Sequence, residues 1–167
     1  MFQEVSVSDL QFNPFDMINK EWLLVTAGNK EQCNTMTASW GSLGILWNKP
    51  ISTIYIRPSR YTLEFLDREP YYSLCVFDES HRETLKYCGS HSGRDGDKIK
   101  ATGLTTLTDE KAPYFAEAKL VFICRKLYKQ TMEPACFIDS SLDSANYANK
   151  DYHKVFTGEI EKVLKKV

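Results

Sequence analysis

The sequence predicts a single, mainly β domain in which about five or six strands form a barrel, with short helices inserted between them. The chain has 167 residues, which is near the commonest size of one domain. Its strand-like segments are rich in β-branched and aromatic residues, and no regular alternation of strands and helices separates them. Because a doubly wound parallel sheet needs that alternation, we favour a barrel formed by residues 1–167 as one unit.

The composition excludes several classes of protein. Hydrophobic residues make up 43% of the chain and charged residues 26%, as in ordinary globular proteins rather than disordered or collagen-like ones. The 21 Lys and Arg residues balance 22 Asp and Glu residues. We therefore expect no nucleic-acid partner, since such a partner calls for a basic excess on one face. We also expect no membrane partner, because no apolar run approaches the ~20 residues of a spanning helix and no signal peptide is recognisable.

The cysteines indicate the compartment. There are five, an odd number, and none forms a C-x-x-C pair. A secreted disulfide framework is usually even and denser, so we expect a cytoplasmic location. Cys75 and Cys124 lie in apolar runs and are expected to pack in the core.

Turn signals and apolar runs define the elements of the first half. Asn13 and Pro14 predict the start of a short helix that ends at Asn19, because proline is favoured at the first helical position. Gly28-Asn29 predicts a turn between two strands of a hairpin. The strands predicted here cover residues 22–27, 33–39 and 51–57, and the last of them is stopped by Pro58.

The second half combines short helices with longer strands. Ser59 is expected to cap a helix over 60–68, which ends before Pro70. The remaining predicted elements are a strand over 71–77, a helix over 81–88, a polar loop over 89–97, a helix over 98–102, and strands over 120–127 and 152–164. Residues 133–150 read as an irregular excursion, either a lid or an arm that reaches a second subunit.

Common catalytic motifs are absent from the chain. It contains no G-x-G-x-x-G, no P-loop and no G-x-S-x-G. His81, His91 and His153 are widely spaced without carboxylates or thiolates at ligand spacing, so we expect no metal site. Asp95-Gly96-Asp97 is expected to form a turn and a helix cap rather than a calcium loop.

Three clusters of polar and aromatic residues could bind an anion and a flat ring. The first combines hydrogen-bonding side chains with one tryptophan, which suits an oxygen-rich ligand beside an apolar wall. A polar strand edge with one core tryptophan explains it equally well. The residues of this cluster are Asn34, Thr35, Met36, Thr37, Ser39 and Trp40.

The second cluster lies where a strand ends and a helix begins. It contains Arg57, Arg60, Tyr61 and Thr62. Two guanidinium groups beside the N–H groups of a helix N-terminus favour a phosphate. The alternative is that both arginines are solvated or paired with nearby acids, for which Glu64 or Asp67 are the candidates.

The third cluster lies in the polar loop before the helix at 98–102. Its hydroxyls, glycine and cations are typical of an anion site, although a flexible surface loop has the same composition. Its residues are Ser90, Ser92, Gly93, Arg94 and Lys98. The three clusters together supply more phosphate donors than the loops of one neutral domain usually carry.

The same clusters belong to a longer series of ordered motifs. The series is Asn34-Thr35-Met36-Thr37-Ala38-Ser39-Trp40, Trp47-Asn48-Lys49-Pro50, Arg57-Pro58-x-Arg60-Tyr61-Thr62, Cys88-Gly89-Ser90-x-Ser92-Gly93-Arg94-Asp95-x-Asp97-Lys98, Ala112-Pro113-Tyr114-Phe115 and Asp151-Tyr152-His153. In this order it strongly resembles the flavin reductase-like, FMN-binding split-barrel family, which includes the flavoredoxins. The resemblance implies a six-stranded antiparallel split barrel, a homodimer, and FMN bound near the subunit interface.

The resemblance also implies a role for each cluster. The first would surround the flavin and the second would flank it. The third would hold the ribityl chain and the phosphate. His153 matches in part a Gly-Asp-His element of NADH-using relatives, so it could contact a nicotinamide or lie beside the flavin. A structural histidine at the start of a strand remains an alternative.

Three functions are compatible with this resemblance. The first is an FMN-dependent oxidoreductase that accepts hydride from NAD(P)H. The second is a flavoredoxin-like carrier that exchanges electrons with a redox partner protein. The third is a flavin-binding module without turnover. The chemistry of the first two belongs to the cofactor, so neither requires a side-chain nucleophile.

Overall fold

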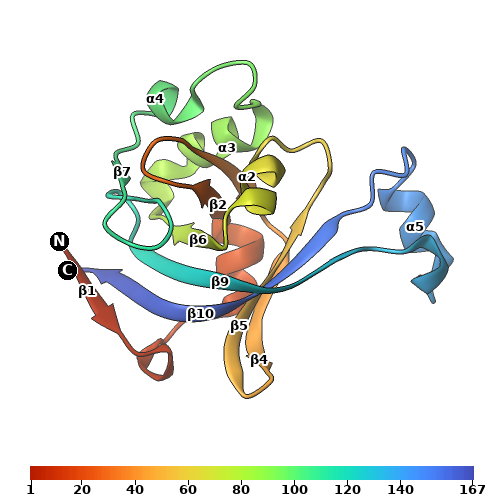
Figure 1. The fold of residues 1–167 in the computed structure, drawn as a ribbon, viewed down its shortest axis with the longest axis horizontal. Helices are drawn as coiled ribbons and strands as arrows, with labels where there is room; N and C mark the ends of the chain where they lie inside the picture. Colours follow the sequence, from red (N-terminus) through yellow and green to blue (C-terminus); the bar gives the residue numbers. More distant parts are fainter.

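In the computed structural model, which describes residues 1–167, an antiparallel sheet of eight strands curls into an open barrel (Figure 1). The strands are β1 (Phe2–Val5), β2 (Leu23–Gly28), β3 (Cys33–Ala38), β4 (Gly41–Leu46), β5 (Lys49–Ile56), β6 (Tyr71–Val76), β9 (Leu120–Thr131) and β10 (Lys154–Lys166). Their order is β3-β2-β6-β9-β10-β5-β4, with β1 paired to β10. A separate small sheet pairs β7 (Thr106–Leu107) with β8 (Tyr114–Phe115). The mainly β antiparallel class is confirmed, although the main sheet has eight strands rather than six.

One of the additional strands is β4, which forms a hairpin with β5. Gly41 and Gly44 weaken its strand signal in the sequence. The two strands are joined by Trp47 and Asn48, whose φ angles are 51° and 57°. Positive φ at both central residues is what a type I′ hairpin turn requires. A tryptophan in this conformation is uncommon, which explains why the turn was not recognised.

The helices are short and lie between the strands. They are α1 (Pro14–Asp16), η2 (Met17–Glu21), α2 (Thr62–Arg68), α3 (Arg82–Ser90), α4 (Lys98–Thr102) and α5 (Ser140–Asn146), with single turns at Val7–Asp9, Glu79–His81 and Pro134–Cys136. None of them is long and apolar enough to cross a bilayer. The expected cap at Asp97 is confirmed, since its side chain accepts a hydrogen bond from the first turn of α4. The helix start expected at Asn13 and Pro14 is also confirmed, and there the Asn13 side chain caps α1. The expected cap at Ser59 is wrong, because Tyr61 occupies that position and makes no side-chain bond.

The sheet buries apolar side chains on both faces. Val25 lies opposite Leu74 and belongs to a cluster of 21 buried residues, which also includes residues of α2. The next pair, Leu24 and Cys75, points to the other face and joins a second cluster of 12 residues beneath α3. Burial raises the pKa of the Cys75 thiol to about 12. Both cysteines that were expected in the core, Cys75 and Cys124, are fully buried.

Strands β9 and β10 continue beyond the barrel and carry residues 132–153, which we call the arm. Figure 1 shows α5 at its far end, on the right of the molecule. The arm was expected to be irregular, but it contains α5 and the turn at Pro134–Cys136. Its base returns to the barrel at His153, whose carbonyl accepts a hydrogen bond from the backbone N–H of Met132 over 3.0 Å.

Candidate functional site

The three predicted clusters meet in the structure. Asn34 of β3 donates a hydrogen bond from Nδ2 to Thr62 Oγ1 at the start of α2, over 2.7 Å. Arg60, just before α2, donates to the carbonyl of Gly89 in α3 over 2.7 Å. Thr37 of β3 donates to the carbonyl of Leu85, also in α3. These contacts join segments far apart in the chain, and we call the two cavities that open beside them the cleft.

The loop of the third cluster lies so close to the first that it needs a glycine. A Cβ on Gly93 would lie 2.1 Å from Asn34 Oδ1 and 2.9 Å from the Tyr61 ring. Real Cβ atoms do not approach other atoms so closely, so any larger residue would displace the loop. Gly93 therefore fixes the distance between β3 and the cations at Arg94 and Lys98.

A polar cavity of about 720 Å³ opens beside this contact. Asn34, Tyr61, Gly93, Arg94 and Lys98 are among the residues that line it. Arg94 donates to Glu64 and, over 3.1 Å, to the carbonyl of Ser59. Its ion pair with Glu64 is about half exposed, because the two side chains retain 45% and 55% of their accessible surface. The cavity thus has a guanidinium group at its rim.

Lys98 lies deeper in the same cavity wall and is only 5% exposed. Its ammonium group donates to the carbonyls of Cys88 and His91 over 3.0 and 3.1 Å. It therefore satisfies carbonyls at the end of α3, which have no partner within the helix. Burial lowers the pKa of Lys98, and Arg60 lowers it further, whereas the Cys88 thiol opposes the shift. An ammonium group has three N–H donors, so one remains for a ligand.

A smaller cavity of about 150 Å³ forms the second part of the cleft; residues of β3 line both cavities, but no single residue lines both. Thr37, Ser39 and Trp40 line one side, and Arg57 and Arg60 line the other. The Trp40 ring is 49% exposed, so it offers a flat apolar surface rather than a core contact. The cavity therefore places cations and hydroxyl groups beside an open aromatic ring.

The expected acidic partners of the arginines are wrong. Arg57 pairs with Asp151 over 2.7 Å and donates to the carbonyl of Asn146 over 3.0 Å. Both partners belong to the arm, nearly a hundred residues away in sequence. Asp67 pairs instead with Lys129 of β9. Arg57 therefore ties the arm to the barrel as well as lining the cleft.

His153 lies where the cleft meets the arm, and it is only 5% exposed. Its Nδ1 atom is 2.7 Å from the hydroxyl of Tyr147, and the Trp40 ring lies 5.5 Å away. Burial lowers the pKa of His153 to about 4; Arg57 adds to this shift and Asp151 opposes it. The imidazole is therefore neutral at pH 7.

Tyr147 and Tyr55 were not recognised as site residues. Tyr147 is held against His153, and Tyr55 lines both the smaller cavity and the adjoining space under the arm. The only signal for Tyr147 was an aromatic residue shortly before the Asp151-Tyr152-His153 motif.

Two predicted residues, Thr35 and Thr62, are too buried to reach a ligand with their side chains, and two serines bond within their own loop. Thr35 is fully buried and donates to the carbonyl of Val25, and Thr62 is 1% exposed. The exposed Ser90 hydroxyl donates to the carbonyl of Lys86, while the Ser92 hydroxyl accepts from the Arg94 N–H. The backbone of β3 remains available, because β3 is an edge strand with unpaired groups on one side.

A curled antiparallel sheet with a cation-rich cleft beside its edge strand defines this chain as a split-barrel protein. Residues 16–166 match the model of the flavin reductase like domain. The chain therefore belongs to the flavin reductase-like domain family. No curated protein matches it significantly.

Solved structures share the fold at low sequence identity. An FMN-binding domain of a flavin reductases-like enzyme from Shewanella baltica is 17% identical, with a TM-score of 0.70 over 99% of this chain and 77% of that one. A flavoredoxin from Methanosarcina acetivorans is 22% identical, with a TM-score of 0.68 over 98% and 76%. An NADH:FAD oxidoreductase from Streptomyces globisporus, in complex with NAD and FAD fragments, is 17% identical, with a TM-score of 0.65 over 87% and 75%. A flavin reductases-like enzyme, a flavoredoxin and an NADH:FAD oxidoreductase thus share this fold.

Proposed function

We propose that the chain is an FMN-dependent oxidoreductase that transfers electrons or hydride through FMN bound in the cleft. The observation that carries this proposal is the convergence of β3, the start of α2 and the loop before α4. The two cavities beside these contacts are lined by cations, small hydroxyl groups and an exposed tryptophan. These are the groups that a phosphate, a ribityl chain and an isoalloxazine ring require.

The residues fit FMN on the chemistry of their donors. Lys98 has a free N–H donor, and Arg94 can exchange Glu64 for a phosphate at little cost, because exposed ion pairs contribute only about 0–1 kcal/mol. Trp40 offers a ring face for an aromatic ligand. No buried polar side-chain atom lacks a partner. The fit therefore depends on groups at the cleft surface.

Bound FMN would supply hydride or single-electron chemistry, and the side chains would tune it. Arg57 and Arg60 provide positive charge beside the small cavity, which favours the more negative reduced flavin. His153 is neutral at pH 7, so it can form hydrogen bonds there without adding a charge. The arm reaches this end of the cleft through the contacts of Asn146 with Arg57 and of Tyr147 with His153.

A carrier without its own NAD(P)H site is the second candidate. The observation that favours it is the low exposure of His153, which is only 5% and leaves little of the imidazole for a nicotinamide to contact. Under this alternative, the electrons would come from a redox partner protein.

We also propose that the chain forms a homodimer. The tip of the β4–β5 hairpin exposes Ile45, Leu46 and Trp47, and Trp47 packs 6.5 Å from the half-exposed Tyr128. Clustered exposed apolar side chains are typical of an interface. Light scattering should give twice the 19.2 kDa chain mass, and Trp47→Ser should lower it. We further propose a cytoplasmic location, which suits the free thiols of the chain.

FMN titration tests the site directly. We expect one FMN per chain, and we expect the double variant Arg94→Ala/Lys98→Ala to weaken binding about 100-fold or more, since charge-assisted hydrogen bonds contribute roughly 1.5–3 kcal/mol each. Because Lys98 also supports α3, Arg94→Ala alone serves as a second variant, with an expected loss of about tenfold. Lys100→Ala, on the exposed face of α4, is the matched control. Unchanged affinity in both Arg94 variants would place the phosphate elsewhere.

Stopped-flow mixing separates the candidate functions. Rapid bleaching of the flavin by NADH or NADPH supports a reductase. Bleaching only by a reduced partner protein supports a carrier, and no bleaching by either supports a binding module. Tyr147→Phe distinguishes a reductase from a carrier further. If the chain is a reductase in which the arm controls access to His153, loss of the Tyr147 hydroxyl should change the rate of flavin reduction by NADH.

A further inference from the structure

Four rings form a continuous row from the cleft to the arm. The centre of the Trp40 ring lies 5.5 Å from that of His153, which lies 5.5 Å from that of Tyr147. Tyr147 stacks on Tyr152, with ring centres 4.9 Å apart. Trp40 is 49% exposed at the cleft end and Tyr152 is partly exposed at the arm end, whereas His153 and Tyr147 are buried between them. The row therefore joins the cleft to the surface of the arm through a buried middle.

Each tyrosine of the row has a base at its hydroxyl group. The Tyr147 hydroxyl donates to His153 Nδ1 over 2.7 Å when Nε2 carries the imidazole proton, and Tyr152 donates to the Asp143 carboxylate over 2.9 Å. The Met132 sulfur, 3.2 Å from the Tyr147 oxygen, is a weaker acceptor. Burial lowers the pKa of His153 to about 4, so its ring is neutral at pH 7 and has a lone pair for a proton. A phenol that loses an electron becomes a strong acid, and a base in contact with it takes up the proton.

Two other tyrosines show what is specific to this row. Tyr128 lies 6.5 Å from the exposed Trp47, but its hydroxyl donates to the amide oxygen of Gln130, which is not a base. Tyr114 donates to the Asp109 carboxylate over 2.9 Å, but its aromatic neighbour is a phenylalanine. Neither pair combines a tryptophan with a tyrosine that has a base, whereas the row does.

The charges beside the row favour its outer end. The Arg57 guanidinium lies 5.2 Å from the centre of the Tyr147 ring. Burial raises the pKa of Tyr147, and Arg57 opposes this shift by more than Asp151 adds to it, so the net charge facing this ring is positive. Tyr152 instead faces the negative charge of Asp143. Loss of an electron is therefore easier at Tyr152 than at Tyr147.

We propose that this row is an electron relay that carries oxidising equivalents out of the cleft to Tyr152. A one-electron oxidant in the cleft takes an electron from Trp40. Tyr147 gives an electron to Trp40 and passes its hydroxyl proton to His153 Nδ1. Tyr152 then gives an electron to Tyr147 and its proton to Asp143, while His153 returns its proton to the Tyr147 oxygen. A thiol or ascorbate in solution is oxidised by one electron and restores Tyr152, to which Asp143 returns the proton.

The relay depends only on residues of this chain. A flavin excited by light is a one-electron oxidant, and only this source of the oxidant rests on the proposed function. The relay is therefore testable without light and without any change in bound flavin.

Azidyl radicals from a radiation pulse test the inner step on the full chain. A Trp47→Phe background makes Trp40 the most exposed tryptophan. Transient absorption should show the tryptophan radical decaying as a phenoxyl radical appears, at a rate independent of protein concentration. Tyr147→Phe and His153→Gln should each slow this transfer about tenfold or more, whereas the matched control Tyr128→Phe should not change it. An unchanged rate in either of the first two variants, or a rate that rises with protein concentration, overturns the proposal.

The exit of the relay is tested with ascorbate. In the parent chain the phenoxyl radical should reach Tyr152 and react with ascorbate in solution. In Tyr152→Phe the radical should remain on Tyr147, which is 6% exposed, and the reaction should slow about tenfold or more. Asp143→Asn retains a hydrogen-bond acceptor but no base, so it should slow the reaction as well. An unchanged ascorbate rate in Tyr152→Phe overturns the proposed exit.

Illumination of the FMN-loaded chain separates the relay from the proposed function. A phenoxyl radical that light produces in the parent chain but not in Tyr147→Phe supports both. If azidyl radicals produce the transfer and light does not, the relay is supported and FMN does not lie beside Trp40. If FMN binds and azidyl radicals produce no transfer, the relay is overturned and the flavin site is unaffected.

Discussion

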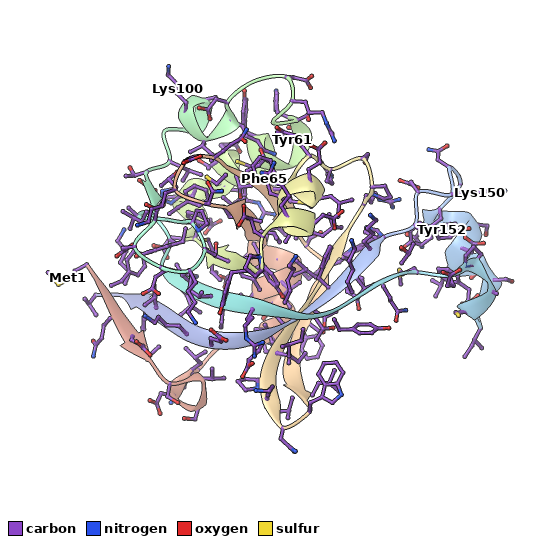
Figure 2. All side chains as sticks on the ribbon, in the orientation of Figure 1. Met1, Tyr61, Phe65, Lys100, Lys150 and Tyr152 are labelled. Atoms are coloured by element: carbon purple, nitrogen blue, oxygen red, sulfur yellow. The ribbon has the colours of Figure 1, made fainter.

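The barrel and the arm are stabilised in different ways. The barrel buries two large apolar clusters on the faces of one sheet. Within the arm, only Tyr147 and His153 are buried, and they contact each other. Figure 2 shows Lys150 and Tyr152 on the arm, far from Tyr61 and Phe65 on the barrel. The barrel therefore owes its stability to buried area, while the position of the arm depends on a few polar contacts that local changes can break.

The largest difference between the two regions should appear when one phenylalanine in each is replaced by alanine and the free energy of unfolding is measured. Phe122→Ala empties a site in β9 that is 1% exposed, so we expect the free energy of unfolding to fall by about 3–5 kcal/mol. Phe137→Ala in the arm should lower it by only about 1 kcal/mol, because the ring is half-buried and contacts mainly Tyr147 and Tyr152. Urea denaturation measures both. Equal losses would show that arm and barrel unfold as one unit.

The second prediction concerns the pH dependence conferred by His153. Its pKa is about 4 in the folded chain and near 6.5 when unfolded, so between these values the unfolded state binds more protons. Stability should therefore fall as the pH drops from about 6.5 to about 4, by on the order of 3 kcal/mol. The groups that face the imidazole are Tyr147, Trp40, Tyr55, Arg57, Arg60 and Asp151.

Carboxylates also titrate in this pH range and change the stability of every variant. The test therefore compares how much stability the wild type and a His153 variant each lose. Urea midpoints of the wild type and His153→Gln are compared at pH 7 and pH 4.5, and the wild type should lose more stability. His91→Gln, at an exposed histidine, is the control and should behave as the wild type. Parallel losses in all three proteins would show that His153 is accessible to protons in the folded chain.

The third prediction concerns the tether between the arm and the barrel. Asp151→Asn removes the ion pair with Arg57, which is partly exposed, so the arm should open about 1 kcal/mol more easily. Amide exchange in α5 should accelerate about fivefold, while exchange in β6 stays unchanged. Asp143→Asn is a matched control within the arm, since Asp143 accepts from Tyr152 and does not contact the barrel. Uniform acceleration across the chain would contradict a local tether.

The sequence could predict those features of the fold that depend on neighbouring residues. The hairpin at Gly28-Asn29, the helix start at Asn13 and the cap at Asp97 depend on neighbouring residues, so local rules predicted them. The meeting of the three clusters could be inferred from their shared chemistry. The strand β4 was missed because glycines weaken its pattern and an unusual tryptophan forms its turn.

Contacts between distant segments were beyond local rules. The partners expected for Arg57 were nearby acids, whereas Asp151 lies on the returning side of the arm. Tyr147 meets His153 six residues later, across a segment without a helix or strand whose conformation no local rule predicts. Such pairs depend on how β9 and β10 position the arm against the barrel, and no short sequence motif predicts that position.

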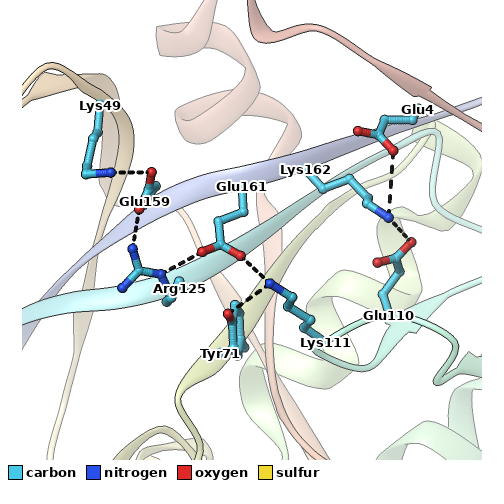
Figure 3. A network of polar contacts seen from close by, with 9 residues as sticks. All are labelled: Glu4, Lys49, Tyr71, Glu110, Lys111, Arg125, Glu159, Glu161 and Lys162. Carbon is cyan, nitrogen blue, oxygen red and sulfur yellow. Dashed lines mark hydrogen bonds and ion pairs between the residues drawn. The ribbon is translucent and has the colours of Figure 1, made fainter.

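The smallest effect is expected where β9 and β10 run along the barrel. There they carry a network of surface ion pairs (Figure 3), in which Glu161 accepts from Lys111 and Arg125 over 2.7 and 2.6 Å. Lys111 and Arg125 are 58% and 39% exposed, so water competes for these contacts. Glu161→Gln should therefore lower stability by less than about 1 kcal/mol. Polar contacts on the barrel surface thus add little to the stability that the buried apolar area already provides.

Salt separates this network from the tether of the arm. At about 1 M salt the screening length falls to ~3 Å, so urea midpoints of the wild type and Glu161→Gln should converge. Glu79→Gln, at an exposed glutamate outside the network, should leave the midpoint unchanged at any salt concentration. The exchange difference caused by Asp151→Asn should persist in part, because Arg57 and Asp151 are only 26% and 31% exposed and salt screens partly buried pairs less. A Glu161 effect that survives high salt would mean that barrel and arm depend on polar contacts alike.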